Sequence, residues 1–493
     1  MVLRKLKKLF ASETVHSLSK KTAKGSFWLL VFRIFSQGLG FIRTIVLARL
    51  LAPADFGLFG VTLLAVSFLD TFSQSGFQSA LIHKKGDIKP YLDTSFVVQA
   101  VRGFFIALLL CVFAPHIATF FQAPAATAML RVVALAMFIQ GLTNIATIYL
   151  QKELEFKKYF FYQVVGTLAD FSFSVVLAVM FRSVWALVIG YLAGITARTI
   201  VSYAIYFYLP KLRFDIAKAK ELFTYGKWVF GTNIIGFFMA QVDSFFVAKV
   251  MGVASLGFYQ VAYKIPSVLN LEVLAGATFP AYSKLQEDKE KLREAYLKIT
   301  KMFALAVMPM AAGIYLLTPQ FIMLFLGTKW LPSLWPMRIL ALSALVWTMA
   351  VVSDYLFLAV GKPHIHARWT SVRFFMMVAL LYPFIGAHGL TGAALVVLAG
   401  STVATFGLTL EAIKIIGCGL SRFIGNVIFL FIDALIMAGV VYGLGMILPV
   451  TLWSFVFSIV AGMLTYGALL MVSDKLFGDR ALRLLKESLG LLR

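Results

Sequence analysis

The first long apolar segment of the chain, residues 26–51, carries polar side chains along one face. Successive residues of an α-helix are about 100° apart, and six polar or small residues of this segment fall within an arc of about 120°: Arg33, Ser36, Gln37, Gly40, Arg43 and Thr44. Lipid does not solvate such a face, so we expect it to border protein or a water-filled cavity. Guanidinium groups bind phosphate oxygens in pairs, which makes Arg33 and Arg43 candidate ligands for an anionic group.

Three later apolar segments carry polar faces of the same kind. In residues 55–81 the face comprises Ser67, Asp70, Thr71, Gln74 and Gln78. In residues 222–250 it comprises Thr232, Gly236 and Asp243, and in residues 254–282 it comprises Gln260, Tyr263, Lys264, Ser267 and Asn270. Gly76 interrupts the helical pattern of the first of these segments, and Pro266 predicts a kink in the last.

Two of the polar segments are spaced from the other two by a constant 200 residues. Residues 24–61 align without a gap to residues 224–261, which pairs Trp28 with Trp228, Ala48 with Ala248 and Gly57 with Gly257. Six spans separate the matched segments, so both copies enter the membrane in the same direction. The alignment therefore predicts two parallel bundles related by an internal duplication, with a central water-filled cavity between their polar faces.

The composition identifies an integral membrane protein. Of 493 residues, 61% are hydrophobic and 14% charged, and the mean hydropathy is +0.89. We expect an all-α protein with about fourteen transmembrane helices. Residues 25–210 and 211–415 would form two six-helix bundles and residues 416–474 two additional helices, flanked by basic cytoplasmic segments at 1–24 and 475–493.

The net charge of +23 reflects membrane topology rather than a nucleic-acid partner. Lys and Arg concentrate in alternate connections, and the opposite connections hold only Arg49, Arg182, Lys249 and Lys329. This asymmetry places both termini and the charged loop around Asp288 in the cytoplasm. The sequence has no metal-ligand spacing and no glycine-rich nucleotide loop, and Cys111 and Cys418 are not expected to form a disulfide.

Several ionisable residues lie near the middle of further predicted spans: Arg102, Asp170, Arg198 and Arg373. Each costs roughly 2.5–3.5 kcal/mol at a helix centre, so each needs a charged partner or water. For Arg102 and Asp170 a structural ion pair and a functional role remain equally open. Asp70 and Asp243 lie on polar faces of opposite bundles, which makes them candidates for binding a coupling proton or Na⁺.

The first polar segment resembles a known family. Its residues Ser36, Leu39, Gly40, Phe41, Arg43, Ala48 and Arg49 fit the pattern S-x-x-L-G-F-x-R…A-R. This resembles Wzx-type flippases such as colanic acid exporters, in the polysaccharide-transporter branch of the multidrug/oligosaccharidyl-lipid/polysaccharide (MOP) exporter superfamily. The resemblance implies two bundles that rock around a central cavity, and Arg43 matches a cavity arginine of lipid II flippases. Thr44 stands where those flippases usually have an acidic residue. Any role of the acidic residue therefore does not apply to this chain.

We therefore expect a flippase that moves undecaprenyl-diphosphate-linked oligosaccharide repeat units across the bacterial inner membrane. The candidate substrate-binding residues, which would neutralise the diphosphate or bind sugar hydroxyls, are Arg33, Gln37, Arg43, Gln74, Gln78, Gln260 and Lys264. The expected partners are membrane lipids and a polysaccharide polymerase and co-polymerase, and no cofactor is expected.

Two alternatives remain. A cation-coupled drug or metabolite antiporter of the same superfamily would use an acidic cavity, which Asp70 and Asp243 could supply. A membrane polysaccharide polymerase or ligase would need a large extracytoplasmic loop, and the outward connections of this chain are short.

Overall fold

The computed structural model describes residues 28, 31–271, 275–276 and 278–477, without the side chains of residues 227–229, 232 and 476–477. The basic segment 1–24 and the tail beyond residue 477 lie outside the described residues. The described residues form helices and their connections, with no strand among them. Eleven of the described helices are long and apolar enough to cross a membrane, or up to twelve when one bent pair counts as a single span. The expected all-α membrane protein is confirmed.

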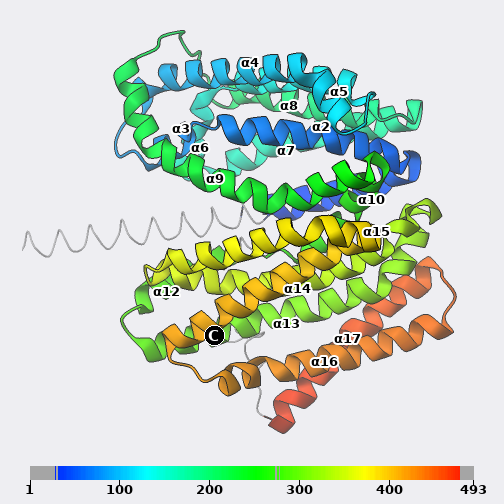
Figure 1. Ribbon diagram of the computed structural model, residues 1–493. Coiled ribbons are helices and arrows are strands. Elements are labelled where there is room, and N and C mark those ends of the chain that lie inside the picture. Colours follow the sequence, from blue (N-terminus) through cyan, green and yellow to red (C-terminus); the bar gives the residue numbers. More distant parts are fainter. Residues whose placement is uncertain (1–27, 29–30, 272–274, 277, 478–493) are drawn as a thin grey trace, which may run out of the picture. The chain divides into compact units, whose positions relative to one another are not determined.

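The chain divides into two units, Met1–Gln241 and Val242–Arg493. The helices of the first unit are Val31–Leu50 (called the first helix below), α2 (Pro53–Ser73), α3 (Phe77–His83), α4 (Lys89–Phe120), α5 (Ala126–Gly141), η1 (Ile145–Thr147), α6 (Ile148–Lys152), α7 (Phe156–Phe181), α8 (Trp185–Ile205) and α9 (Ile216–Met251) as far as Gln241. Within this unit α7 packs on α8, α4 on α5, and α5 on α8, while α2 contacts α4 and α5 (Figure 1).

The second unit continues from the end of α9. Its helices are α10 (Val253–Lys264), η2 (Pro266–Leu269), α12 (Phe279–Leu285), α13 (Lys289–Phe321), η3 (Ile322–Leu326), η4 (Thr328–Ser333), α14 (Leu334–Ala359), α15 (Pro363–Ile416), α16 (Leu420–Ile447) and α17 (Leu452–Phe477). Here α14 packs on α13 and α15, and α16 packs on α13 and α17 (Figure 1).

Glycine and proline interrupt the helices where the sequence predicts. Gly76 has φ 68°, a left-handed conformation that suits glycine, and it separates α2 from α3. At Pro266, whose ring removes a backbone donor, α10 gives way to the 3₁₀ turn η2. Gly389 (φ 58°, ψ −137°) divides the 54 residues of α15 into two helices. An unbroken helix of this length would extend about 80 Å, far beyond a hydrocarbon core of about 30 Å.

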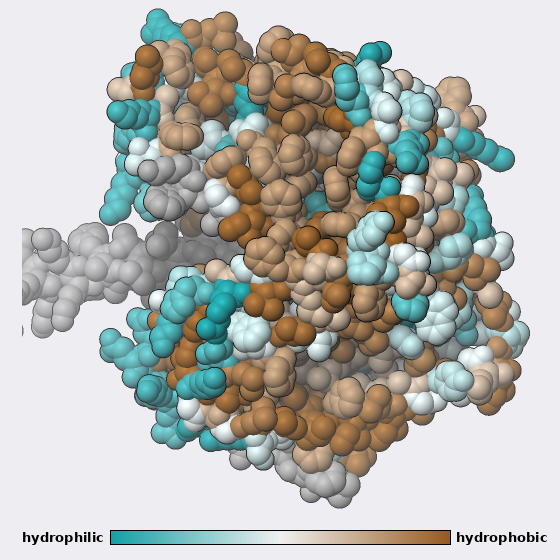
Figure 2. All heavy atoms as spheres, viewed as in Figure 1, coloured by the Kyte–Doolittle hydropathy of each residue, from teal (hydrophilic) through white to brown (hydrophobic). Residues whose placement is uncertain are grey.

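The outer faces of the helices are apolar. Large hydrophobic side chains are more than half exposed at Phe104 and Phe105 on α4, Phe173 on α7 and Phe457 on α17. In each unit, hydrophobic side chains cover the middle of the helices and hydrophilic ones gather toward the helix ends (Figure 2). This distribution suits helices whose central parts face hydrocarbon and whose ends face water.

Candidate functional site

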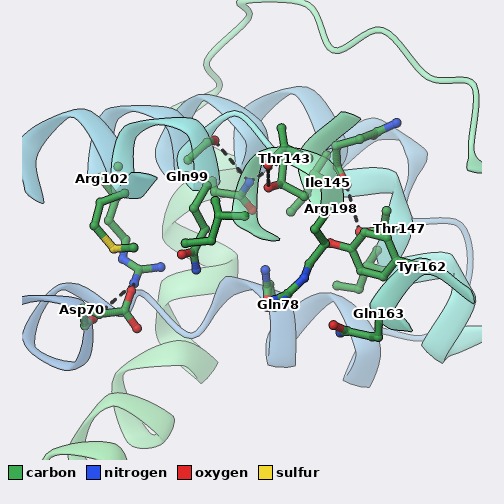
Figure 3. A pocket seen from close by; sticks show the side chains of 18 of the residues that line it. Asp70, Gln78, Gln99, Arg102, Thr143, Ile145, Thr147, Tyr162, Gln163 and Arg198 are labelled. Carbon is green, nitrogen blue, oxygen red and sulfur yellow. Dashed lines mark hydrogen bonds and ion pairs between the residues drawn. The ribbon is translucent and has the colours of Figure 1, made fainter. Parts of the chain in front are cut away.

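A polar pocket of about 210 Å³ opens inside the first unit, between α2–α3 and helices α4 to α8 (Figure 3). Its lining includes six side-chain amides, two guanidinium groups and one carboxylate: Gln78, Gln99, Gln140, Asn144, Gln151, Gln163, Arg102, Arg198 and Asp70. Polar groups at membrane depth are costly and are retained where they meet one another, water or a ligand. The pocket is therefore the candidate functional site of this unit.

Glycines at the contact between α7 and α8 leave room for the charged side chains near the pocket. A Cβ added at Gly190 would lie 1.9 Å from Ser174 Oγ, and one at Gly194 would lie 2.8 Å from Asp170 Cβ. On the facing helix, a Cβ at Gly166 would lie 2.9 Å from Arg198 Nε. Small residues at these contacts allow two helices to approach and leave space for polar side chains between them.

Arg43 of the first helix is held by two residues of α7. Its Nη2 lies 2.9 Å from Asp170 Oδ1, and its Nε and Nη2 donate to Ser174 Oγ at 3.2 and 2.9 Å. Ser174 Oγ in turn donates to Asp170 Oδ1 at 3.2 Å. The sequence identified both charged residues but not their pairing. Because the Asp170 carboxylate balances the Arg43 guanidinium, this arginine does not present an uncompensated charge in this conformation.

A second ion pair joins Asp70 of α2 to Arg102 of α4 at one end of the pocket (Figure 3). Arg102 also donates from Nε to Ser73 Oγ at 3.0 Å and from Nη2 to the Asp70 carbonyl at 3.2 Å. Gln74 Nε2 donates to Asp70 Oδ2 at 3.3 Å, and Gln74 Oε1 accepts from Asn233 Nδ2 of α9. Asp70 is thus bound on both oxygens, and Gln74 supports the pair without lining the pocket.

The amides that line the pocket fall into two groups. Gln99 Nε2 is committed to the carbonyl oxygens of Gly141 and Thr143 at 3.2 and 2.8 Å, and Gln163 Nε2 donates to Tyr159 Oη at 2.8 Å. No hydrogen bond joins the side chain of Gln78 or Gln140 to another described residue. These two amides keep both donor and acceptor capacity for a ligand.

The other predicted site residues lie elsewhere. Arg33 and Gln37 are on the first helix, Arg33 half-buried and Gln37 exposed, and neither lines the pocket. Gln260 and Lys264 are on α10 of the second unit, the first half-buried and the second exposed. Asp243, also in the second unit, is buried and accepts from Tyr259 Oη at 2.9 Å and from the Ser244 amide at 2.7 Å.

Of the residues predicted to bind substrate or ions, the structure brings Asp70 and Gln78 into the pocket, with Gln74 beside them. The sequence indicated that Arg102 and Arg198 need a partner or water, but it did not place them at a common site. The sequence gave no signal for Gln99, Gln140 or Gln163, since a single glutamine in an apolar segment does not form a recognisable polar face.

Comparisons with known proteins agree with this architecture. Residues 46–334, more than half of the chain, match the family described as polysaccharide biosynthesis protein. The chain belongs to this family. Among related proteins is the lipopolysaccharide biosynthesis protein WzxC of Escherichia coli K12, 24% identical over 88% of this chain and 89% of that protein. Another is the succinoglycan biosynthesis transport protein ExoT of Rhizobium meliloti, 25% identical over 72% of each chain.

Solved structures share the fold of this family member. The lipid II flippase MurJ in an inward closed conformation superposes with a TM-score of 0.76 at 16% identity, covering 90% of this chain and 98% of that one. An inward-facing multidrug resistance MATE transporter of the MOP superfamily gives a TM-score of 0.62 at 18% identity, over 77% and 94% of the two chains. The resemblance drawn from the first-helix pattern is confirmed by the family match and by the related polysaccharide biosynthesis proteins, and the solved structures show a shared fold.

Proposed function

We propose that this protein is a flippase that translocates undecaprenyl-diphosphate-linked oligosaccharide repeat units across the bacterial inner membrane for polysaccharide export. A diphosphate and a row of sugar hydroxyls cannot cross hydrocarbon unaided, because each polar group would lose its hydrogen bonds to water. The flippase would provide polar groups at membrane depth and expose them alternately to the two sides.

The observation that carries this proposal is the polar pocket inside a bundle of membrane-crossing helices in a member of the polysaccharide biosynthesis protein family. Free amides at Gln78 and Gln140 suit sugar hydroxyls, and guanidinium groups suit anions. Relatives named for lipopolysaccharide and succinoglycan biosynthesis support a glycan as the polar part of the substrate. Arg33, Gln37, Arg43, Gln74, Gln260 and Lys264 remain the further residues proposed to bind it.

The proposal includes a topology of fourteen spans in two parallel six-helix bundles and two C-terminal helices. Three features support this count: the bent pair α5 and α6 as one span, the division of α15 at Gly389, and the broken segment that begins with α10. The distribution of Lys and Arg supports cytoplasmic termini. A polysaccharide polymerase and co-polymerase would act on the product at the outer face.

Transport by purified protein tests the proposal. The substrate is an undecaprenyl-diphosphate-linked oligosaccharide whose sugar carries a fluorophore, placed in the inner leaflet of proteoliposomes. We expect the label to become accessible to a membrane-impermeant reductant faster than in protein-free vesicles. Label that stays protected as long as in protein-free vesicles would overturn the proposal.

The same vesicles separate the alternative of a cation-coupled drug antiporter, which would move a cationic dye down an imposed proton or Na⁺ gradient. Within the described pocket the one carboxylate, Asp70, is already paired with Arg102, so the lining does not supply a free negative charge for a cation. Relatives named as a transport protein or a probable flippase also support a transporter rather than a polymerase or ligase.

A further inference from the structure

We propose that the pocket of the first unit is a subsite for an acidic sugar of the glycan, and that Arg198 binds its carboxylate. This inference rests on the proposed function and names the class of sugar that the flippase accepts. The lipid diphosphate is common to all substrates of such a flippase, whereas an acidic sugar distinguishes some glycans from others. The pocket would therefore make the flippase select glycans that contain an acidic sugar.

A charge balance in the first unit supports an anionic ligand. Two arginines are each compensated by a carboxylate, Arg102 by Asp70 and Arg43 by Asp170. Arg198 makes no salt bridge within 4 Å of a carboxylate in the described part of the chain, and its buried Nε has no hydrogen-bond partner there. Its electrostatic neighbour Asp170 is already paired with Arg43. Arg43 and Arg198 thus share one carboxylate, which leaves an excess of positive charge at membrane depth, and an anionic ligand would balance it.

The position of Arg198 supports a ligand inside the pocket. Its side chain extends from α8 into the pocket toward Gln78, beside Tyr162 and Gln163 (Figure 3). The glycine at position 166 leaves the space that the Arg198 side chain occupies, because a Cβ there would lie 2.9 Å from Nε. The buried Nε side of the guanidinium faces Gly166, so a carboxylate in the pocket would bind through the two terminal nitrogens.

The remaining lining suits the rest of a sugar ring. Gln78 and Gln140 keep free amide groups for hydroxyls. The buried ring of Tyr162 offers an aromatic face. Sites for drug-sized ligands have volumes of about 300–1,000 Å³. A pocket of about 210 Å³ is smaller and fits one sugar unit rather than a whole repeat unit.

Two substrates that differ only in the charge of one sugar test the proposal. Both carry undecaprenyl diphosphate; one ends in glucuronic acid and the other in glucose. We expect Arg198→Gln to slow flipping of the acidic substrate at least tenfold and to change flipping of the neutral one less than threefold. Arg131→Gln, which removes an exposed arginine of α5, is the matched control and should leave both rates unchanged.

The outcomes separate this inference from the proposed function. If wild-type protein flips neither substrate, the proposed function fails and the subsite fails with it. If it flips both and Arg198→Gln slows both equally, the flippase stands but Arg198 serves the diphosphate or the fold, and the subsite is overturned.

A binding measurement on the wild-type protein tests the subsite even if the Arg198→Gln variant does not fold. Methyl glucuronoside should raise the thermal unfolding temperature of the purified full-length protein more than methyl glucoside does, because a ligand that binds only the folded state stabilises it. Equal effects of the two glycosides would overturn the acidic-sugar subsite.

Discussion

Arg43 and Asp170 form an ion pair inside the first unit, with Nη2 2.9 Å from Oδ1, and Ser174 bonds to both side chains. Both charged side chains are mostly buried, at 20% and 26% exposure. The arginine of the first-helix pattern is therefore compensated in this conformation. A diphosphate that binds Arg43 would have to compete with Asp170, which gives the site two alternative states.

The first prediction concerns this pair. Arg43→Ala should abolish transport because it removes a proposed phosphate ligand, and Arg43→Lys should restore it only in part because an ammonium lacks the planar fork. The pairing also implies that Arg43→Ala lowers protein abundance, since it leaves Asp170 uncompensated. From the sequence alone we would expect normal abundance.

The double variant Arg43→Ala/Asp170→Ala separates the two roles of Arg43. It should recover abundance without recovering transport in the proteoliposome assay. Recovery of transport would show that Arg43 acts only through its ion pair.

The second prediction concerns ion coupling. Asp70→Asn and Asp243→Asn should each change the dependence of transport on pH or Na⁺, because an amide cannot take up a proton or an ion as a carboxylate does. A shift from mostly one state to mostly the other requires about 5.5 kcal/mol of differential affinity, which favours carboxylates acting together with arginines such as Arg102. Rates measured in proteoliposomes under imposed gradients test this. Unchanged ion dependence in both variants would move the coupling site to Asp170 or to Asp354 of α14, whose Oδ1 lies 2.6 Å from His366 Nδ1.

The third prediction concerns topology. In a variant without Cys111 and Cys418, a single cysteine at residue 288 should react with an impermeant thiol reagent only from the cytoplasmic side. A single cysteine at residue 182, in an opposite connection, is the control and should react from outside. Labelling of residue 288 from outside would refute the topology.

The fourth prediction concerns the packing of α7 on α8. Gly190→Ala should destabilise the protein by about 1–3 kcal/mol, because its Cβ would lie 1.9 Å from Ser174 Oγ in a close-packed contact. Gly313→Ala is the matched control, since a Cβ there meets nothing within 4 Å. Thermal unfolding of the purified variants measures the difference. Equal stability would mean that α7 and α8 can separate without cost.

The fifth prediction concerns pH outside the membrane spans. Hydrogen bonds from Lys84 and Tyr91 hold the pKa of Glu221 below its ordinary value of 4.5, so the contact between the start of α9 and α3–α4 is stabilised above that pH and weakens as pH falls through the lower folded pKa. Protection factors for hydrogen exchange at residues 216–226, which correct for the intrinsic dependence of exchange on pH, should fall below pH 4.5 in wild type. In Glu221→Gln these protection factors should change little with pH, and an equal decrease in this variant would contradict the assignment.

The sequence by itself determined the class of protein and the local breaks in its helices. Hydropathy fixes membrane-spanning segments because a span must satisfy its backbone hydrogen bonds internally. The breaks at Gly76 and Pro266 follow from backbone conformations that depend on one residue each. Helical phase also selected Asp70 and Gln78, which the structure places in the pocket.

Only the tertiary structure decided which charges meet. Helical phase tells which face a residue lies on, but not which helix packs against that face. Asp70 pairs with Arg102 because α2 contacts α4. Asp170 pairs with Arg43 because the first helix lies against α7, where Phe32 and Phe35 contact Phe160. The tertiary structure also leaves Arg198 without a salt bridge among the described residues, since a charge balance depends on distances in space and not on spacing along the chain.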